Sequence, residues 1–183
     1  MESQPWEARA AAKRADTLNK IYSQWRLSAQ DVKRASEQRD LTGPFIQGFL
    51  SQQEISILSM DSVPIVNATK QGQLTSVQVT TAFRKAAAIA NQINNCLHEI
   101  FFDQALERAK ELDEHYRKHG TTIGPLHGLP ASLKDQFHVK GIDTATGYVV
   151  WIGSTMGIKD PSQSHKVESE ITRELLSLGA VLY

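Results

Sequence analysis

Glycine and proline residues punctuate the segment 120–141 so closely that only a short strand fits between the turns. Gly120 and the Gly124-Pro125 turn end the helical pattern that precedes them. The run Ala131–Lys134 follows, and we predict a strand there. Apolar burial favours the neutral form of an amine, and Leu133 and the neighbouring turns are compatible with such burial of Lys134. Lys134 is therefore a candidate catalytic base.

Helical and strand-like patterns alternate along the chain. Apolar periodicity and capping residues predict helices within the first 40 residues, from Ser51, from Asp61 to Gly72, at 76–94, at 103–119 and around 167–178. Short apolar runs predict strands at 96–100, 131–134 and 180–183, with β-like pieces around 148–152. This alternation predicts an α/β fold with a mixed or parallel sheet and flanking helices. The turn at Thr42-Gly43-Pro44 separates a helical N-terminal region, 1–50, from a main domain, 51–183.

The composition excludes several classes of function. With 183 residues, 40% of them hydrophobic, the chain can bury the core of one domain. Twenty basic and 20 acidic residues cancel, so no positive surface is expected for nucleic acid or anionic membrane. No stretch approaches the roughly 18 apolar residues of a membrane helix, and the N-terminus lacks the apolar region of a secretion signal. We expect a cytoplasmic protein without nucleic-acid or membrane partners.

Cysteine and histidine residues give weaker indications. The single cysteine, Cys96, excludes an intrachain disulfide, and its apolar surroundings predict core packing rather than nucleophilic catalysis. His115 and His119 share a helical face, but Tyr116 stands where a metalloprotease has glutamate, and no third ligand is evident. We therefore predict no metal site. His127 lies in the turn before the predicted strand, and we expect packing or a loop hydrogen bond rather than catalysis.

Several runs in the chain form a longer pattern. They are Gly-Pro-Leu-His-Gly-Leu-Pro at 124–130, Ser-Leu-Lys-Asp at 132–135 and Val-Lys-Gly at 139–141. This pattern resembles the amidase signature family, whose enzymes hydrolyse carboxamides with a Ser–cis-Ser–Lys triad. Asn-Cys-Leu-His-Glu-Ile-Phe-Phe-Asp at 95–103 and Tyr-Val-Val-Trp at 148–151 resemble the fungal acetamidase-like branch. An amidotransferase subunit acting on charged transfer RNA shares the lysine motif and remains an alternative.

The resemblance implies a role for Lys134 as general base in a charge relay. The lysine deprotonates a cis-serine, which activates a nucleophilic serine, and water hydrolyses the resulting acyl-enzyme. No metal or cofactor is implied, and the substrate is a small-molecule amide. The family's Gly-Gly-Ser-Ser-Gly-Gly signature is absent from these 183 residues, so the chain holds no nucleophile. We expect a truncated N-terminal portion of the amidase signature fold, inactive alone.

Three further hypotheses stand beside this interpretation. Ser132 and Lys134 lie two residues apart and would share a strand face, but nothing near Ser132 supplies an oxyanion hole, so we do not expect a dyad. The chain is alternatively a non-catalytic remnant with a binding or regulatory role. The apolar run 180–183 reads as a strand of an unfinished sheet, whose open edge favours self-association.

Overall fold

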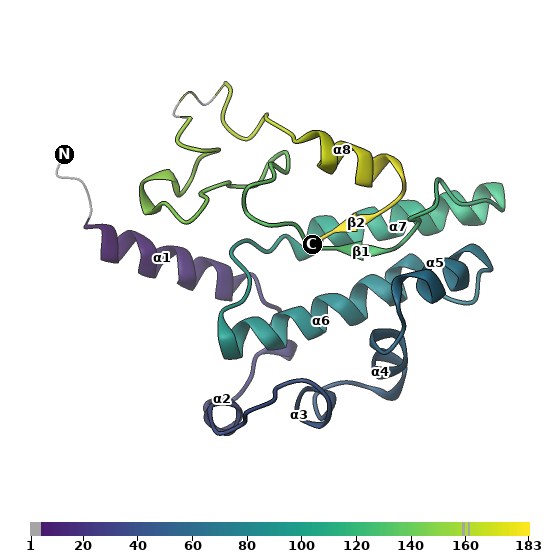
Figure 1. Cartoon of the computed structure of the whole chain (residues 1–183), viewed down its shortest axis with the longest axis horizontal. Coiled ribbons are helices and arrows are strands. Elements are labelled where there is room, and N and C mark those ends of the chain that lie inside the picture. Colours follow the sequence, from purple (N-terminus) through teal and green to yellow (C-terminus); the bar gives the residue numbers. More distant parts are fainter. Residues whose placement is uncertain (1–4, 159, 161) are drawn as a thin grey trace.

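Helices dominate the computed structural model, which describes residues 5–158, 160 and 162–183 (Figure 1). The helices are α1 (Trp6–Asn19), α2 (Ala29–Ser36), α3 (Pro44–Gln47), α4 (Gln52–Leu58), α5 (Ser62–Lys70), α6 (Ser76–Asn94), α7 (Phe102–His119) and α8 (Glu170–Ser177). Two short 3-10 helices, η1 (Ser23–Trp25) and η2 (Val149–Trp151), and two strands, β1 (Pro130–Ala131) and β2 (Val181–Leu182), complete the elements. No helix among the described residues is both long and apolar enough to cross a membrane.

The long helices α6 and α7 pack against each other at the centre of the molecule, with α8 on one side and α2, α3 and α4 on the other (Figure 1). Helix α6 begins with a capping box between Thr75 and Gln78, which satisfies two otherwise unpaired backbone donors. Helix α7 places Ala105, Ala109 and Leu112 on one buried face, as its 3.6-residue period requires. Both predicted helices are confirmed to within one residue at each end.

The sheet is much smaller than predicted. Strands β1 and β2 are parallel, with Pro130 opposite Val181 and Ala131 opposite Leu182. The predicted strand at 96–100 is wrong, because the Leu97 N–H donates to the Asn91 side chain at 2.8 Å rather than to a neighbouring strand. The β-like pieces around 148–152 are wrong as well, because i→i+3 bonds close a 3-10 turn there.

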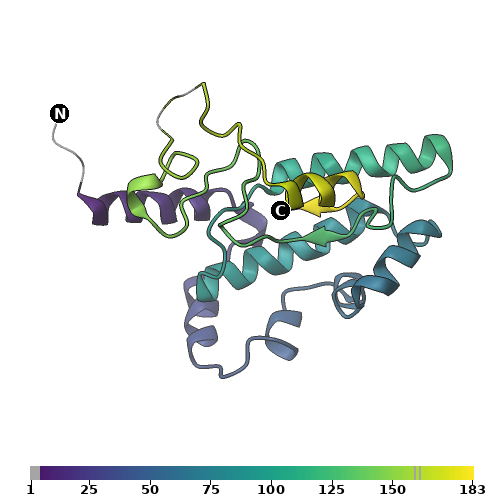
Figure 2. The same cartoon turned by 45° about the horizontal axis from the view of Figure 1, so that its top comes forward.

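The N-terminal segments pack onto the same core as α6. Ile21 and Trp25 are buried against Ala88 of α6 and Phe102 of α7. Helix α1 lies beside η2, an arrangement that both views show (Figure 2). The division of the chain at residue 50 remains a prediction.

A buried arginine joins the N-terminal segments to α6. Arg84 is only 1% exposed, and its guanidinium lies 5.1 to 5.5 Å from the ring centres of Tyr22, Trp25 and Phe102. It donates a hydrogen bond to the Tyr22 hydroxyl at 2.6 Å, and that hydroxyl donates in turn to Asp103. Because the planar guanidinium stacks on aromatic faces, it fills this site with no direct carboxylate partner among residues 5–158, 160 and 162–183.

Candidate active site

A pocket of about 580 Å³ opens beside Lys134. One wall of this pocket comes from residues 96–101, which connect α6 to α7, and we call it the first wall. The second wall comes from residues 139–147, downstream of Lys134. Leu182 and Tyr183, at and beyond the end of β2, close the pocket on a third side.

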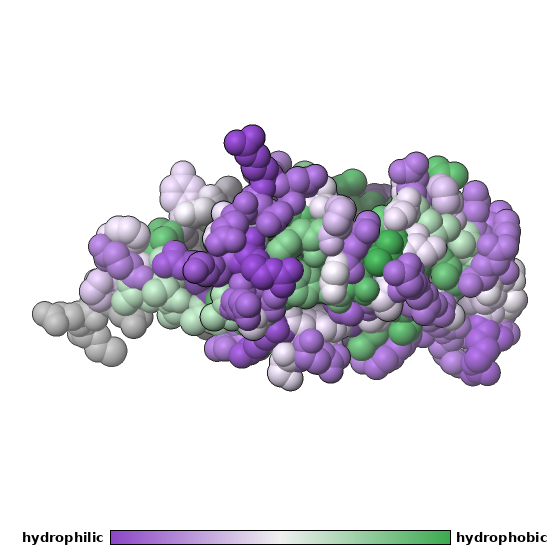
Figure 3. Space-filling view, turned by 90° about the horizontal axis from the view of Figure 1, so that it is seen from below, coloured by the Kyte–Doolittle hydropathy of each residue, from purple (hydrophilic) through white to green (hydrophobic). Residues whose placement is uncertain are grey.

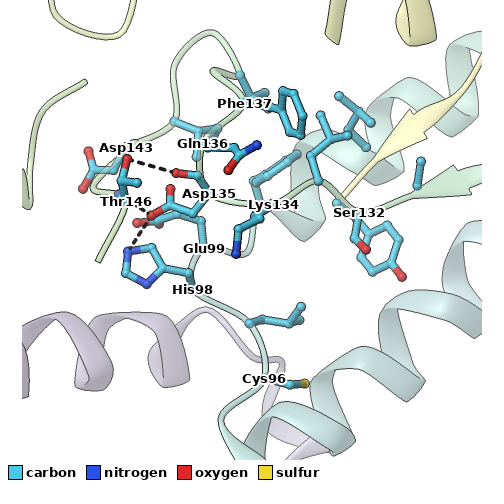
Figure 4. A pocket seen from close by; sticks show the side chains of 18 of the residues that line it. Cys96, His98, Glu99, Ser132, Lys134, Asp135, Gln136, Phe137, Asp143 and Thr146 are labelled. Atoms are coloured by element: carbon cyan, nitrogen blue, oxygen red, sulfur yellow. Dashed lines mark hydrogen bonds and ion pairs between the residues drawn. The ribbon is translucent and has the colours of Figure 1, made fainter. Parts of the chain in front are cut away.

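Lys134 follows β1 and projects into the pocket (Figure 4). Its carbonyl accepts hydrogen bonds from the backbone N–H groups of Gln136 and Phe137, at 2.7 and 3.0 Å, so the residue lies in a turn beyond the short strand. Its side chain is exposed, and among the described residues its ammonium group has no hydrogen bond and no ion pair. Among the described residues, the Lys134 amine therefore lies at the pocket and is not buried among apolar groups, although its neighbours in the sequence are compatible with such burial.

Ser132 also lines the pocket, as its spacing from Lys134 predicts. Its side chain and that of Lys134 point to different parts of the pocket (Figure 4). Within the described part of the chain, the Ser132 hydroxyl makes no hydrogen bond to the lysine amine. No Ser–Lys dyad is formed in this arrangement.

Asp135 connects the turn that carries Lys134 to both walls. Its carboxylate accepts a hydrogen bond from the Thr146 N–H at 2.7 Å and lies 3.3 Å from Nε2 of His98 (Figure 4). Thr146 adopts a left-handed backbone with φ of 49°, which is uncommon for a residue other than glycine. The bond from its N–H to Asp135 helps to hold that conformation.

A charged cluster joins the two walls. Lys13 of α1 forms ion pairs with Glu99 of the first wall and, at 3.0 Å, with Asp143 of the second. The Asp143 carboxylate also accepts a hydrogen bond from the Gly153 N–H at 2.9 Å. Its other oxygen, Oδ1, lies 2.8 Å from Nε2 of His165. Sequence reasoning missed this cluster, because its members lie far apart in the chain and none belongs to a local charge pattern.

Burial and pairing shift the pKa values in this cluster. Burial works to lower the pKa of Lys13, but hydrogen bonds and attraction to the two carboxylates outweigh it and raise that pKa. Burial raises the pKa of Glu99, and Lys13 offsets only part of this effect. Burial also works to raise the pKa of Asp143, but bonds from Lys13, Gly153 and His165 hold that pKa below its usual value. The cluster therefore keeps Lys13 and Asp143 charged near neutral pH.

Cys96 lies exposed at the pocket rather than in the core, so the prediction of core packing is wrong. Its run does contain buried Ile100, but Cys96 follows the left-handed Asn95 that ends α6, and the chain turns outward there. Partial burial raises the pKa of the Cys96 thiol, which keeps the thiol protonated and a poor nucleophile at neutral pH.

The histidines outside the pocket have structural surroundings. His127 is 3% exposed, and its Nδ1 accepts a hydrogen bond from the Ile123 N–H at 3.1 Å, which confirms the predicted loop hydrogen bond. Burial lowers the pKa of His127, so the acceptor nitrogen stays free of a proton near pH 7. The rings of His115 and His119 lie 4.6 Å apart, and the described residues include no cluster of three or more potential metal ligands.

Comparison with known proteins places these residues in a family. Residues 78–183, which include the pocket, match the sequence profile of the family described as Amidase. The chain belongs to the amidase family. Among curated relatives of this family, acetamidase from Emericella nidulans is 42% identical over 98% of the chain, and acetamidase from Aspergillus oryzae is 39% identical over 99% of it.

A solved structure of an amide hydrolase has the same fold over this length. Fatty acid amide hydrolase superposes with a TM-score of 0.80 and 29% identity, over 98% of this chain and 31% of that protein. The chain spans 30% of the length of the Emericella nidulans acetamidase and 31% of the Aspergillus oryzae one. The small parallel sheet with helices around it is therefore part of a larger amidase fold.

Proposed function

We propose that the chain is the lysine-bearing part of an acetamidase-like carboxamide hydrolase, which converts a monocarboxylic amide and water to a carboxylate and ammonia. One observation carries the proposal: Lys134 projects into an open pocket, inside the segment that matches the amidase family, with no partner for its amine among the described residues. The identity to two fungal acetamidases supports this choice of substrate class.

In the proposed mechanism Lys134 acts as the general base of a Ser–cis-Ser–Lys triad. A base lysine must lose its proton, and covering the pocket with further protein would remove water and favour the neutral amine. The 183 residues contain no Gly/Ser-rich signature that would supply the two serines. We therefore expect the chain alone to release no ammonia from acetamide. The single free cysteine supports a reducing compartment such as the cytoplasm.

A chimera tests the role of Lys134. This chain replaces the matching segment of the Emericella nidulans acetamidase, and ammonia release from acetamide is measured. Lys134→Ala should lower kcat by about 10²- to 10⁴-fold, the usual contribution of a general base. Lys140→Ala is the matched control, because Lys140 is also exposed and has no ion pair within the described residues. An active chimera that keeps its activity after Lys134→Ala would contradict the proposal.

One observation favours a second candidate, a binding module without catalysis. The pocket is formed by the described residues themselves, with Asp135 joining its walls. The chain alone would then bind an amide without hydrolysing it. Chemical-shift changes confined to 132–137 on addition of acetamide, together with an inactive chimera, would favour this candidate over the enzyme.

A further inference from the structure

The two walls of the Lys134 pocket have no regular secondary structure to hold them together. Residues 96–101 connect two helices, and residues 139–147 are turns and irregular loop. Each wall contributes one carboxylate at the pocket, Glu99 on the first and Asp143 on the second. Lys13 contacts both carboxylates at once.

This contact is largely removed from water. The side chains of Lys13, Glu99 and Asp143 are 12%, 9% and 16% exposed. A charge in such a place is costly unless it is paired, and removing one partner leaves the others uncompensated. Lys20 and His165 approach the same two carboxylates from more exposed positions, with side chains 42% and 34% exposed. Lys13 is therefore the inner cation of the cluster and joins the two walls directly, whereas Asp135 joins them through the turn that carries Lys134.

Helix α1, which carries Lys13, has little other attachment. Thr17 is its only buried residue among those described. Besides Lys13, the polar contacts of α1 with the second half of the chain come from Arg9, which donates to the carbonyl groups of Val150 and Ile152 at 3.5 and 3.3 Å. An amphipathic helix normally docks through an apolar stripe, and α1 lacks one. Ile21 and Trp25 anchor the chain just beyond the end of α1, and Lys13 and Arg9 supply the polar contacts of the helix itself with the second half of the chain.

We propose that Lys13 is a positioning residue that fixes the first wall against the second and so sets the width of the pocket into which Lys134 projects. The proposal rests on the proposed function only in treating this pocket as the substrate site. The ion pairs themselves need no substrate. Lys13 also lies outside residues 78–183, so its role falls outside the segment that matches the family profile.

Without Lys13, the carboxylates of Glu99 and Asp143 lose the cation between them and keep only the more exposed Lys20 and His165 as partners. The two charges repel each other above the pKa values of the carboxyl groups, and protonation at lower pH removes the repulsion. Lys13→Met should therefore separate the walls at pH 7.5 and do so much less at pH 4.5. Lys13→Arg should restore the contact, because a guanidinium can bridge two carboxylates.

Hydrogen exchange of the 183-residue chain tests the proposal without any catalytic assay. Lys13→Met should lower the protection factors of the Leu97 and Thr146 amides, one from each wall, by roughly tenfold or more at pH 7.5. Lys13→Arg and the control Lys20→Met should leave them within about twofold of the parent chain. In the triple variant Lys13→Met/Glu99→Gln/Asp143→Asn protection at pH 7.5 should return only part of the way to that of the parent chain, because the repulsion is gone but the bridge between the walls is still missing.

Three results would overturn the proposal. Loss of protection confined to α1 would mean that Lys13 holds only its own helix. An equal effect at pH 7.5 and 4.5 would remove the role of the two carboxylates. If Lys13→Met unfolds the chain and the triple variant is also unfolded, Lys13 would be needed for the stability of the whole fold rather than for the spacing of the walls. An inactive chimera together with the expected exchange pattern would reject the proposed amide hydrolase function but would still support the positioning role of Lys13.

Discussion

Several residues in the described part of this protein hold charges where water is scarce, and Arg84 and Asp143 show how neighbouring groups compensate such a charge. Arg84 stacks on three aromatic rings and bonds to Tyr22. Asp143, at the pocket, is bonded to Lys13, Gly153 and His165. Such groups make the stability of the fold sensitive to small changes that leave its apolar packing intact, because an unmatched buried donor or charge costs its full desolvation.

The hydroxyl of Tyr22 is a sharp test of the Arg84 site. Tyr22→Phe removes the acceptor of the guanidinium N–H and the donor to Asp103. We expect a loss of about 1–3 kcal/mol in the free energy of unfolding, measured by urea denaturation. Tyr148→Phe serves as the control, because Tyr148 is 58% exposed. Equal midpoints for the two variants would mean that the hydroxyl contributes nothing.

Asp143 predicts a dependence of stability on acid pH. Its pKa is depressed in the folded chain, so its contribution is present above the unfolded value of about 4 and is lost as the pH falls through the folded pKa. As the pH is lowered from 5 to 2, the melting temperature should fall less steeply for Asp143→Asn than for the parent chain. Parallel curves would show that the carboxylate is not stabilised by Lys13, Gly153 and His165.

At the level of elements, the turn at 124–130, which we call the signature turn, meets the two long helices α6 and α7. The carboxylate of Asp113 on α7 accepts hydrogen bonds from the N–H groups of Ser76 and Val77, at 2.6 and 3.0 Å, at the beginning of α6. Gly128 of the signature turn approaches the same place, with a positive φ of 77°. The start of α6 is therefore the point where α7 and the chain leading to β1 meet.

Removing the Asp113 carboxylate should weaken this joint. We expect Asp113→Ala to cost about 1–2 kcal/mol, as the loss of a helix cap does. Glu111→Ala is the matched control on the same helix, because its ion pair with Arg108 is mainly exposed on the Glu111 side. Urea midpoints of the two variants give the comparison. A loss no larger than that of Glu111→Ala would assign the cap no energetic role.

A second pair of variants separates backbone strain from contact. A Cβ on Gly128 would lie 2.5 Å from the Ser76 hydroxyl, whereas one on Gly120 would meet nothing within 4 Å, although φ is positive at both. Gly120→Ala should cost about 1 kcal/mol from backbone strain alone. Gly128→Ala should cost more, because Ser76 is buried and must shift. Equal shifts in melting temperature for Gly120→Ala and Gly128→Ala would show that Ser76 moves away from the added Cβ at little cost.

The elements that could be predicted from the sequence are those whose information is local. Helices at 76–94 and 103–119 follow from their own periodicity, and the Ser51 capping box forms as expected. The prediction of a strand at 96–100 was wrong because an apolar run is equally compatible with a loop, and this loop buries Ile100 against Ile21 and Trp25. The surroundings of Lys134 in the chain single it out, and it lies at the pocket, while its catalytic role stays a prediction. Lys13 and Asp143 are 130 residues apart, and no local pattern joins them.

The molecule presents open sheet edges and exposed apolar side chains. The sheet has two strands among the described residues, so each strand has an edge without a strand partner. Trp6, Val63 and Val150 are each 65% exposed, and apolar side chains appear across the middle of the face seen from the side of α2, α3 and α4 (Figure 3). An open edge and exposed apolar side chains both favour association.

We therefore expect the 183-residue chain to self-associate. Sedimentation velocity over a range of concentrations should show dimers or larger species, and thermal melts should be broad. Joining the chain to the rest of an acetamidase should sharpen the melt, because the exposed surface is then covered. A monomer with a single steep transition at every concentration would contradict this expectation and favour the binding-module candidate.

The register of the sheet also bears on the order in which the chain assembles. Helices α6 and α7 are neighbours in sequence and close a short loop, whereas Val181 must find Pro130 across the segment that contains the second wall and α8. Closing a longer loop costs more conformational entropy before any contact compensates for it. The helix pair should therefore fold early, and the β1–β2 pairing, which brings Tyr183 to the pocket, should come late. The pocket beside Lys134, which Leu182 and Tyr183 close on one side, should then be the last part of this chain to form.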